Sequence, residues 1–152
     1  MLTRRHLLVT AATLPLAALG SHVARAATAP VFANKGIAIN GYDPVAYFTK
    51  QTHLAGSDQH ALDWNGAWWL FSSAETREMF ANTPKAYAPQ YGGYCAFAMA
   101  HGAIAKTAPD AWTVYEGKLY LNYSTVVRGQ WSEDIPGNIK RADAHWPGIL
   151  DK

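Results

Sequence analysis

The chain has 152 residues, enough for one domain of ordinary size, and its formal charge is only +2 at neutral pH. Beyond the first 26 residues, no run of lysine or arginine is present to follow a phosphate backbone, which argues against nucleic-acid binding. Residues 27–152 also hold no long apolar stretch, so we expect no membrane span in that part of the chain.

Residues 1–26 have the pattern of an export signal. The pair Arg4 and Arg5 precedes an apolar run, Leu7 to Leu19, and Ala24-Arg25-Ala26 offers small residues for cleavage. The apolar run is too short to span a bilayer. The paired arginines indicate the twin-arginine route to the bacterial periplasm, with an ordinary Sec signal as the alternative. Removing this segment would lower the formal charge to about −1.

The first half of the mature chain predicts one hairpin. We expect residues 27–34 to be a flexible lead-in and residues 35–150 to be a single domain that opens with a short β-type run at 35–39. Pro44 biases Asp43 away from helical angles, so residues 45–48 are expected to be extended or in a turn. Asn65-Gly66 predicts a hairpin of 60–64 and 67–71, because both turn positions favour positive φ.

The second half predicts short helices around another hairpin. Capping residues and glycine or proline stops indicate helices at about 73–82, 94–101, 124–131 and 138–146. Glu116-Gly117 predicts a hairpin of 111–115 and 118–122. Hairpins between short helices are typical of an α+β domain, here two antiparallel hairpins with three to four short helices.

The only cysteine, Cys95, is the main candidate for chemistry. It stands where a helix is expected to start, and free N–H groups there stabilise a thiolate. Met99 follows four residues later on the same side, and a thiolate with a thioether suits Cu(I). His101 joins them only if the last turn unwinds. Alternatively, Cys95, Phe97 and Met99 are core residues, or Cys95 is a redox-active thiol.

Other candidate residues carry weaker signals. His53 and His60 could converge on an ion, although exposed loop histidines usually bind nothing. Asp43 is expected to be a turn residue rather than an acid or base, and Glu133 with Asp134 to be solvated. Several tyrosines line either an aromatic pocket with the tryptophans or simply a ring-rich core: Tyr42, Tyr47, Tyr87, Tyr91 and Tyr94. Motifs of hydrolases, metalloproteases, phosphate loops and paired cysteines are missing, which favours a non-catalytic class.

Several motifs in order resemble the YHS domain family, and in particular exported bacterial YHS domain-containing proteins. The resemblance rests on these segments: Asp43-Pro44-Val45, the run 68–73, the helix with Phe80, Asn82, Pro84 and Tyr87, Tyr91-Gly92-Gly93-Tyr94-Cys95, Ala111-Trp112-Thr113, the run 117–122, Asp134-Ile135-Pro136-Gly137 and Trp146-Pro147. Metal-associated members of that family place cysteines after Asp-Pro-Val and in the Phe-Ser region. Here Ala46, Ser72 and Thr76 stand at those places. The resemblance therefore implies the fold and metal handling, but not those ligands.

The sequence thus predicts a periplasmic YHS-domain protein that binds or passes on a soft metal, most plausibly copper, through Cys95, Met99 and His101. The first alternative is a non-catalytic module that binds a small ligand or a protein and in which Cys95 is structural. The second alternative is a thiol-dependent redox protein.

Overall fold

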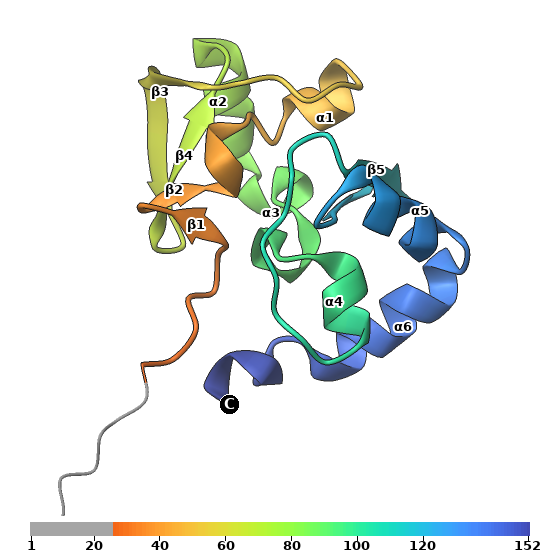
Figure 1. Cartoon of the computed structure of the whole chain (residues 1–152). Coiled ribbons are helices and arrows are strands. Elements are labelled where there is room, and N and C mark those ends of the chain that lie inside the picture. Colours follow the sequence, from red (N-terminus) through yellow and green to blue (C-terminus); the bar gives the residue numbers. More distant parts are fainter. Residues whose placement is uncertain (1–25) are drawn as a thin grey trace, which may run out of the picture.

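The computed structural model describes residues 26–152, so the arginine pair and the apolar run of the expected export signal lie outside the described residues. Within them, six α-helices and two sheets form one small α+β domain (Figure 1). The predicted fold class is confirmed. In this part of the chain, none of the helices combines the length and the apolar character that crossing a membrane requires.

The first sheet is mixed and has four strands in the order β1-β2-β4-β3. Its strands are β1 (Ala33–Asn34), β2 (Ile37–Ala38), β3 (Ser57–Trp64) and β4 (Ala67–Phe71). β3 and β4 are the predicted hairpin, and Asn65 and Gly66 have φ of 52° and 81° as that turn requires. The small β1–β2 hairpin and the parallel pairing of β2 with β4 were not predicted.

Asp43 joins the start of the domain to the end of β4. Its buried carboxylate accepts hydrogen bonds from the backbone N–H of Val45 at 2.9 Å and of Ala46 at 3.4 Å. It also accepts from the backbone N–H and the hydroxyl of Ser72, at 2.9 and 2.7 Å. These bonds start the one-turn helix α1 (Ala46–Thr49), where an extended segment or a turn was expected. Asp43 is therefore a turn residue, as predicted.

Five more helices follow, and side-chain caps, including that of Cys95, begin four of them. They are α2 (Ala74–Asn82), α3 (Pro84–Tyr87), α4 (Ala96–Ala100), α5 (Thr125–Ser132) and α6 (Ile135–His145). Ser73, Ser124 and Asp134 each accept the N–H of the residue three positions later. α6 starts three residues earlier than predicted, because Asp134 caps it. α3 was not predicted, although Pro84 suits a first helical position.

The second sheet is the predicted hairpin of β5 (Trp112–Tyr115) and β6 (Lys118–Leu121). β6 runs between two groups of buried aromatic side chains. Side chains alternate along a strand, so Leu119 and Leu121 pack into one group and Tyr120 packs into the other. Three short 3-10 segments complete the described chain: Ile39–Gly41, Gln90–Gly93 and Gly148–Asp151.

We name these two groups by their location. The sheet cluster is centred on Trp69, Phe71 and Phe80, with the half-buried Trp64 against it. The helix cluster is centred on Tyr91, Tyr120 and Trp131, with the half-buried Trp146 against it. In Figure 1 the first sheet with α2 and the group of α4, α5 and α6 lie in different parts of the domain, with α3 between them. The fold therefore has two aromatic cores that meet along β6.

The segment expected to be a flexible lead-in is bound to the domain. The backbone N–H of Thr28 donates to the carbonyl of Leu150 at 3.1 Å, and the N–H of Phe32 donates to Gly92 at 2.9 Å. The hydroxyl of Tyr94 donates to the carbonyl of Ala29 at 2.9 Å. Figure 1 shows the same neighbourhood, with the described start of the chain near the C-terminal turn. The structure thus differs from the expectation, because this segment packs against the domain.

Candidate functional site

Cys95 lies in the interior, where the fold uses its thiol. The residue is 1% exposed and is the N-cap of α4. Its Sγ accepts the backbone N–H of Ala98 at 3.4 Å and donates toward Oδ1 of Asn122 at 3.7 Å. The same Asn122 oxygen accepts the N–H of Phe97 at 3.0 Å. Cys95 thus stands at the expected helix start, and its sulfur helps to join α4 to the end of β6.

The other two candidate metal ligands lie at different depths. Met99 is fully buried in the helix cluster, whereas His101 is exposed. The Nδ1 atom of His101 lies 2.8 Å from the carbonyl oxygen of Phe97, and the two rings are 4.6 Å apart. Across residues 26–152, histidine, cysteine and acidic side chains form no group of three that could hold a metal ion. Copper binding by this trio therefore stays a prediction.

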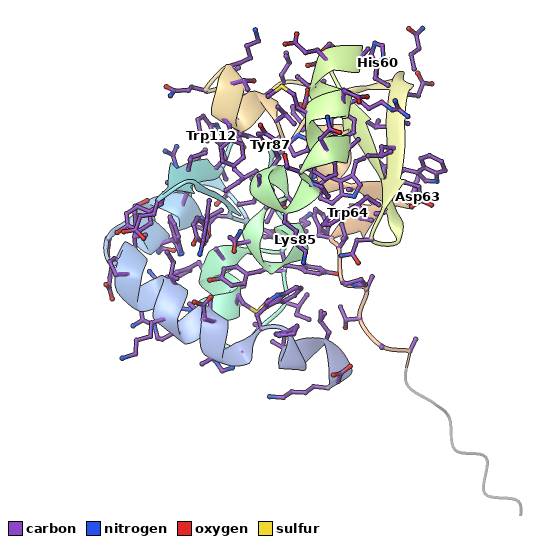
Figure 2. All side chains as sticks on the ribbon, turned by 180° about the vertical axis from the view of Figure 1, so that it is seen from behind. His60, Asp63, Trp64, Lys85, Tyr87 and Trp112 are labelled. Atoms are coloured by element: carbon purple, nitrogen blue, oxygen red, sulfur yellow. The ribbon has the colours of Figure 1, made fainter. Side chains whose placement is uncertain are left out.

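The remaining polar candidates have local roles. Asp134 caps α6 and pairs with Arg141 at 3.4 Å, and both side chains are largely exposed. His53 packs beside the ring of Tyr42 with centroids 5.9 Å apart, and His60 is half-buried on β3 (Figure 2). The structure does not bring these groups into one site.

Of the five tyrosines expected to line either an aromatic pocket or a ring-rich core, one lines a cleft. Tyr91 lines a cleft of about 520 Å³, together with Trp64, Trp69 and Trp146. Tyr47 instead donates its hydroxyl to the carbonyl of Pro109. The cleft volume falls within the range of roughly 300–1,000 Å³ that is usual for small-molecule sites. Tryptophan side chains thus supply three of its four aromatic walls.

The two core clusters each contribute one aromatic pair to this cleft. Trp64 and Trp69 come from the sheet cluster, with ring centroids 5.7 Å apart. Tyr91 and Trp146 come from the helix cluster, with centroids 6.2 Å apart. The indole N–H of Trp69 donates to the carbonyl of Trp64 at 2.9 Å, which holds the first pair in place. The cleft is therefore located where the two cores meet at the surface.

The N-terminal segment forms another wall of the cleft. Pro30 and Val31 line it, and Val31 is buried. Gly92, which has a φ of +63°, lets this segment approach, because a Cβ there would lie 2.0 Å from the carbonyl oxygen of Pro30. Pro147 and Leu150 from the end of the chain also line the cleft. Segments far apart in the sequence therefore converge on this site.

The charged side chains of the cleft are two lysines. Lys85 of α3 and Lys118 at the start of β6 line it, and both are exposed. Figure 2 shows Lys85 near Trp64, between α3 and the hairpin. No aspartate or glutamate in the described part of the chain lines the cleft. In residues 26–152, the ion pair joins Arg141 and Asp134 and involves neither lysine.

Tyr91 is held as a neutral hydrogen-bond donor. Its hydroxyl donates to Oδ1 of Asp143 at 2.9 Å. Burial, followed by this hydrogen bond to a carboxylate, raises the pKa of Tyr91 well above its ordinary value. The ring therefore presents an uncharged surface to the cleft at neutral pH.

Comparison with known proteins adds nothing to this geometry: no family model, no curated protein and no solved structure matches the chain.

Proposed function

We propose that this protein is a non-catalytic binding protein whose cleft holds a small molecule with a flat apolar ring. The observation that carries the proposal is the convergence of one aromatic pair from each core on a single cleft. Large rings bury much apolar area at little conformational cost, so they suit recognition of a flat ligand. This choice corresponds to the first alternative drawn from the sequence.

The composition of the cleft wall supports binding rather than catalysis. Its residues include no serine, cysteine, histidine, aspartate or glutamate, which are the side chains that commonly serve as nucleophiles or bases. The hydroxyl of Tyr91 is engaged by Asp143. The buried thiol of Cys95 caps α4 and is absent from the cleft wall. In this proposal Cys95 is structural.

Cellular location and family are part of the same proposal. The expected twin-arginine signal would deliver the folded domain to the periplasm, where the cleft would meet compounds that enter the cell envelope. Membership of the YHS family remains a proposal that rests on the motifs from Asp43-Pro44-Val45 onward. The bonds between Asp43 and Ser72 give the first of those motifs a structural reason that requires no metal.

The binding proposal is tested with 2-naphthamide, a neutral flat probe, followed through the indole N–H signals in NMR. We expect shifts at Trp64, Trp69 and Trp146, with little change at Trp68 and Trp131, which do not line the cleft. Ala88→Phe narrows the cleft and should abolish the shifts.

The matched control is Ala86→Phe, an exposed position on α3 two residues before Ala88 and outside the cleft wall, which should leave binding intact. Absence of any shift would refute the proposal. So would binding by the Ala88→Phe variant that equals the wild type.

A further inference from the structure

We infer that the ligand of this cleft carries an anionic group next to its ring, bound with the ring inward and the charge at the rim. This inference rests on the proposed function and adds the chemical class of the ligand. The compound is a planar aromatic acid, and Lys85 with Lys118 select its charge.

The charged side chains of the cleft wall are positive. Lys85 and Lys118 are the charged side chains of the cleft wall, and no carboxylate accompanies them there. The part of the chain that follows the expected export signal has a formal charge of about −1, so this local positive charge does not reflect a generally basic domain. Charges beside low-dielectric aromatic walls produce a stronger local potential than the same charges on an open surface. The cleft therefore attracts anions.

The two lysines converge on one rim of the cleft. Lys85 is on α3 and Lys118 begins β6, and these two elements pack against each other. The Glu116-Gly117 turn fixes the start of β6, since Glu116 and Gly117 have φ of 48° and 72°. Both ammonium groups thus belong to one rim rather than to opposite faces of the molecule.

The different depths of the cleft side chains set the orientation of the ligand. Trp69 and Tyr91 are buried, with exposures of 1% and 4%, whereas both lysines are exposed. The cleft is therefore apolar at depth and cationic at its mouth. A flat ring gains most by covering the half-buried Trp64 and Trp146, and its charged group keeps partial hydration beside the lysines. The amide side chains of Asn65 and Gln90 also line the cleft and can donate to the same group.

The use of lysine rather than arginine sets how strictly the cleft selects among anions. A lysine ammonium acts as a compact point charge and lacks the planar fork with which arginine matches a carboxylate. The rim therefore selects for negative charge and does not discriminate strongly between carboxylate and sulfonate. The ring and the charge, together, define the ligand class.

The test compares three probes of the same ring: 2-naphthoate, 2-naphthamide and 2-naphthylmethylammonium. Isothermal titration of the folded protein at low salt should show 2-naphthoate binding about ten-fold more tightly than the neutral amide. The cationic amine should bind most weakly. Higher salt should reduce the advantage of the anion, because exposed charges are screened.

The variant for the test is the double substitution Lys85→Gln with Lys118→Gln, and its matched control is Lys140→Gln, an exposed lysine on α6 outside the cleft. The double variant should bind acid and amide equally, and Lys140→Gln should bind like the wild type. All three positions are exposed, so the fold should be retained, and unfolding curves verify it.

The outcomes separate this inference from the proposed function. Equal affinity of wild type for acid and amide would overturn the anion inference and leave the cleft as a binding site. An anion preference that survives the double substitution would also overturn it, because the charge would then come from elsewhere. Failure of all three probes to bind would overturn the proposed function itself.

Discussion

The two aromatic clusters are stabilised in different ways. Rings of the sheet cluster pack mainly on one another: Phe80 lies 5.2 Å from both Trp69 and Phe71 and 5.5 Å from Trp64. The polar atoms of its Trp69 and Tyr47 donate to backbone carbonyls. The helix cluster contains tyrosines, and the hydroxyls of Tyr91 and Tyr94 donate to Asp143 and to the carbonyl of Ala29. It also holds the indole N–H of Trp131, which is buried without a partner among residues 26–152.

This difference indicates that the two clusters contribute to the stability of the fold in different ways. Apolar packing concentrates stability in the sheet cluster, since Phe71 and Phe80 at its centre need no polar compensation when buried. The helix cluster is more polar, so its stability depends on hydrogen bonds and on pH. The cleft draws on both, which makes each cluster separately testable through stability and through binding.

The largest expected effect is on the sheet cluster. Phe80→Ala should lower the free energy of unfolding by about 3–5 kcal/mol, because a large ring leaves a cavity among three aromatic neighbours. Denaturant titration measures it. Phe80→Leu keeps most of the volume and should cost clearly less. A cost below about 1 kcal/mol for Phe80→Ala would show that this cluster is not the centre of stability.

Alkaline pH should act mainly on the helix cluster. Burial is the main cause that raises the pKa of Tyr91 and Tyr94, and it raises that of Tyr120 to about 12. Burial also raises the pKa of Tyr47 in the sheet cluster. The folded state therefore keeps protons that the unfolded chain releases near pH 10.

The sign of the pH effect follows from this difference. The contribution to stability is complete below pH 10 and is lost as pH rises from 10 toward the folded-state values. Unfolding curves between pH 8 and 12, with tyrosinate absorbance recorded in parallel, measure it. The idea would be contradicted by constant stability up to pH 11, together with tyrosines that all ionise near pH 10 in the folded protein.

Removing one tyrosine hydroxyl tests the hydrogen bonding of the helix cluster and should lower stability less than Phe80→Ala. Tyr91→Phe should lower the free energy of unfolding by about 1 kcal/mol, because Asp143 is exposed and water replaces the lost donor. It should also weaken the decline of stability above pH 10. The control is Tyr87→Phe, at a half-buried ring that packs edge-on against Phe48. An equal cost for both variants would count against the role of the Asp143 bond.

The smallest expected effect is at Cys95. Cys95→Ser should change stability by less than about 1 kcal/mol, since serine also accepts the N–H of Ala98 and is a favoured cap. Cys95→Ala should cost about 1 kcal/mol more, because the cap is lost. Alkylation of the native thiol should be slow, and the copper content of protein purified from the periplasm should be the same for wild type and Cys95→Ser. Rapid alkylation would favour the redox alternative, and copper lost with the thiol would favour the metal alternative.

Local features of the fold were predictable because local chemistry determines them. Asn65-Gly66 and Glu116-Gly117 correctly predicted both hairpins, and Ser73 and Ser124 correctly predicted the starts of two helices. The parallel pairing of β2 with β4 was not predictable in this way, because it joins Ile37 to Trp68 across 30 residues of chain.

The candidate site was harder to predict for a related reason. Trp64, Lys85, Lys118 and Trp146 come from separate elements, and no spacing along the chain relates them. A clue was available in Trp64 and Lys118, which flank the predicted hairpin turns, but only the fold places them on one cleft with Lys85 and Trp146. The burial of Cys95 likewise depends on Asn122 and β6, which the sequence around the cysteine does not reveal.

The most direct test of the account is whether one bound molecule touches both clusters. Intermolecular nuclear Overhauser effects from 2-naphthoate protons should reach Trp64 or Trp69 of the sheet cluster and Tyr91 or Trp146 of the helix cluster in the same complex. Effects confined to one cluster, or directed to the exposed Trp68, would contradict the claim that the cleft between the two cores is the binding site.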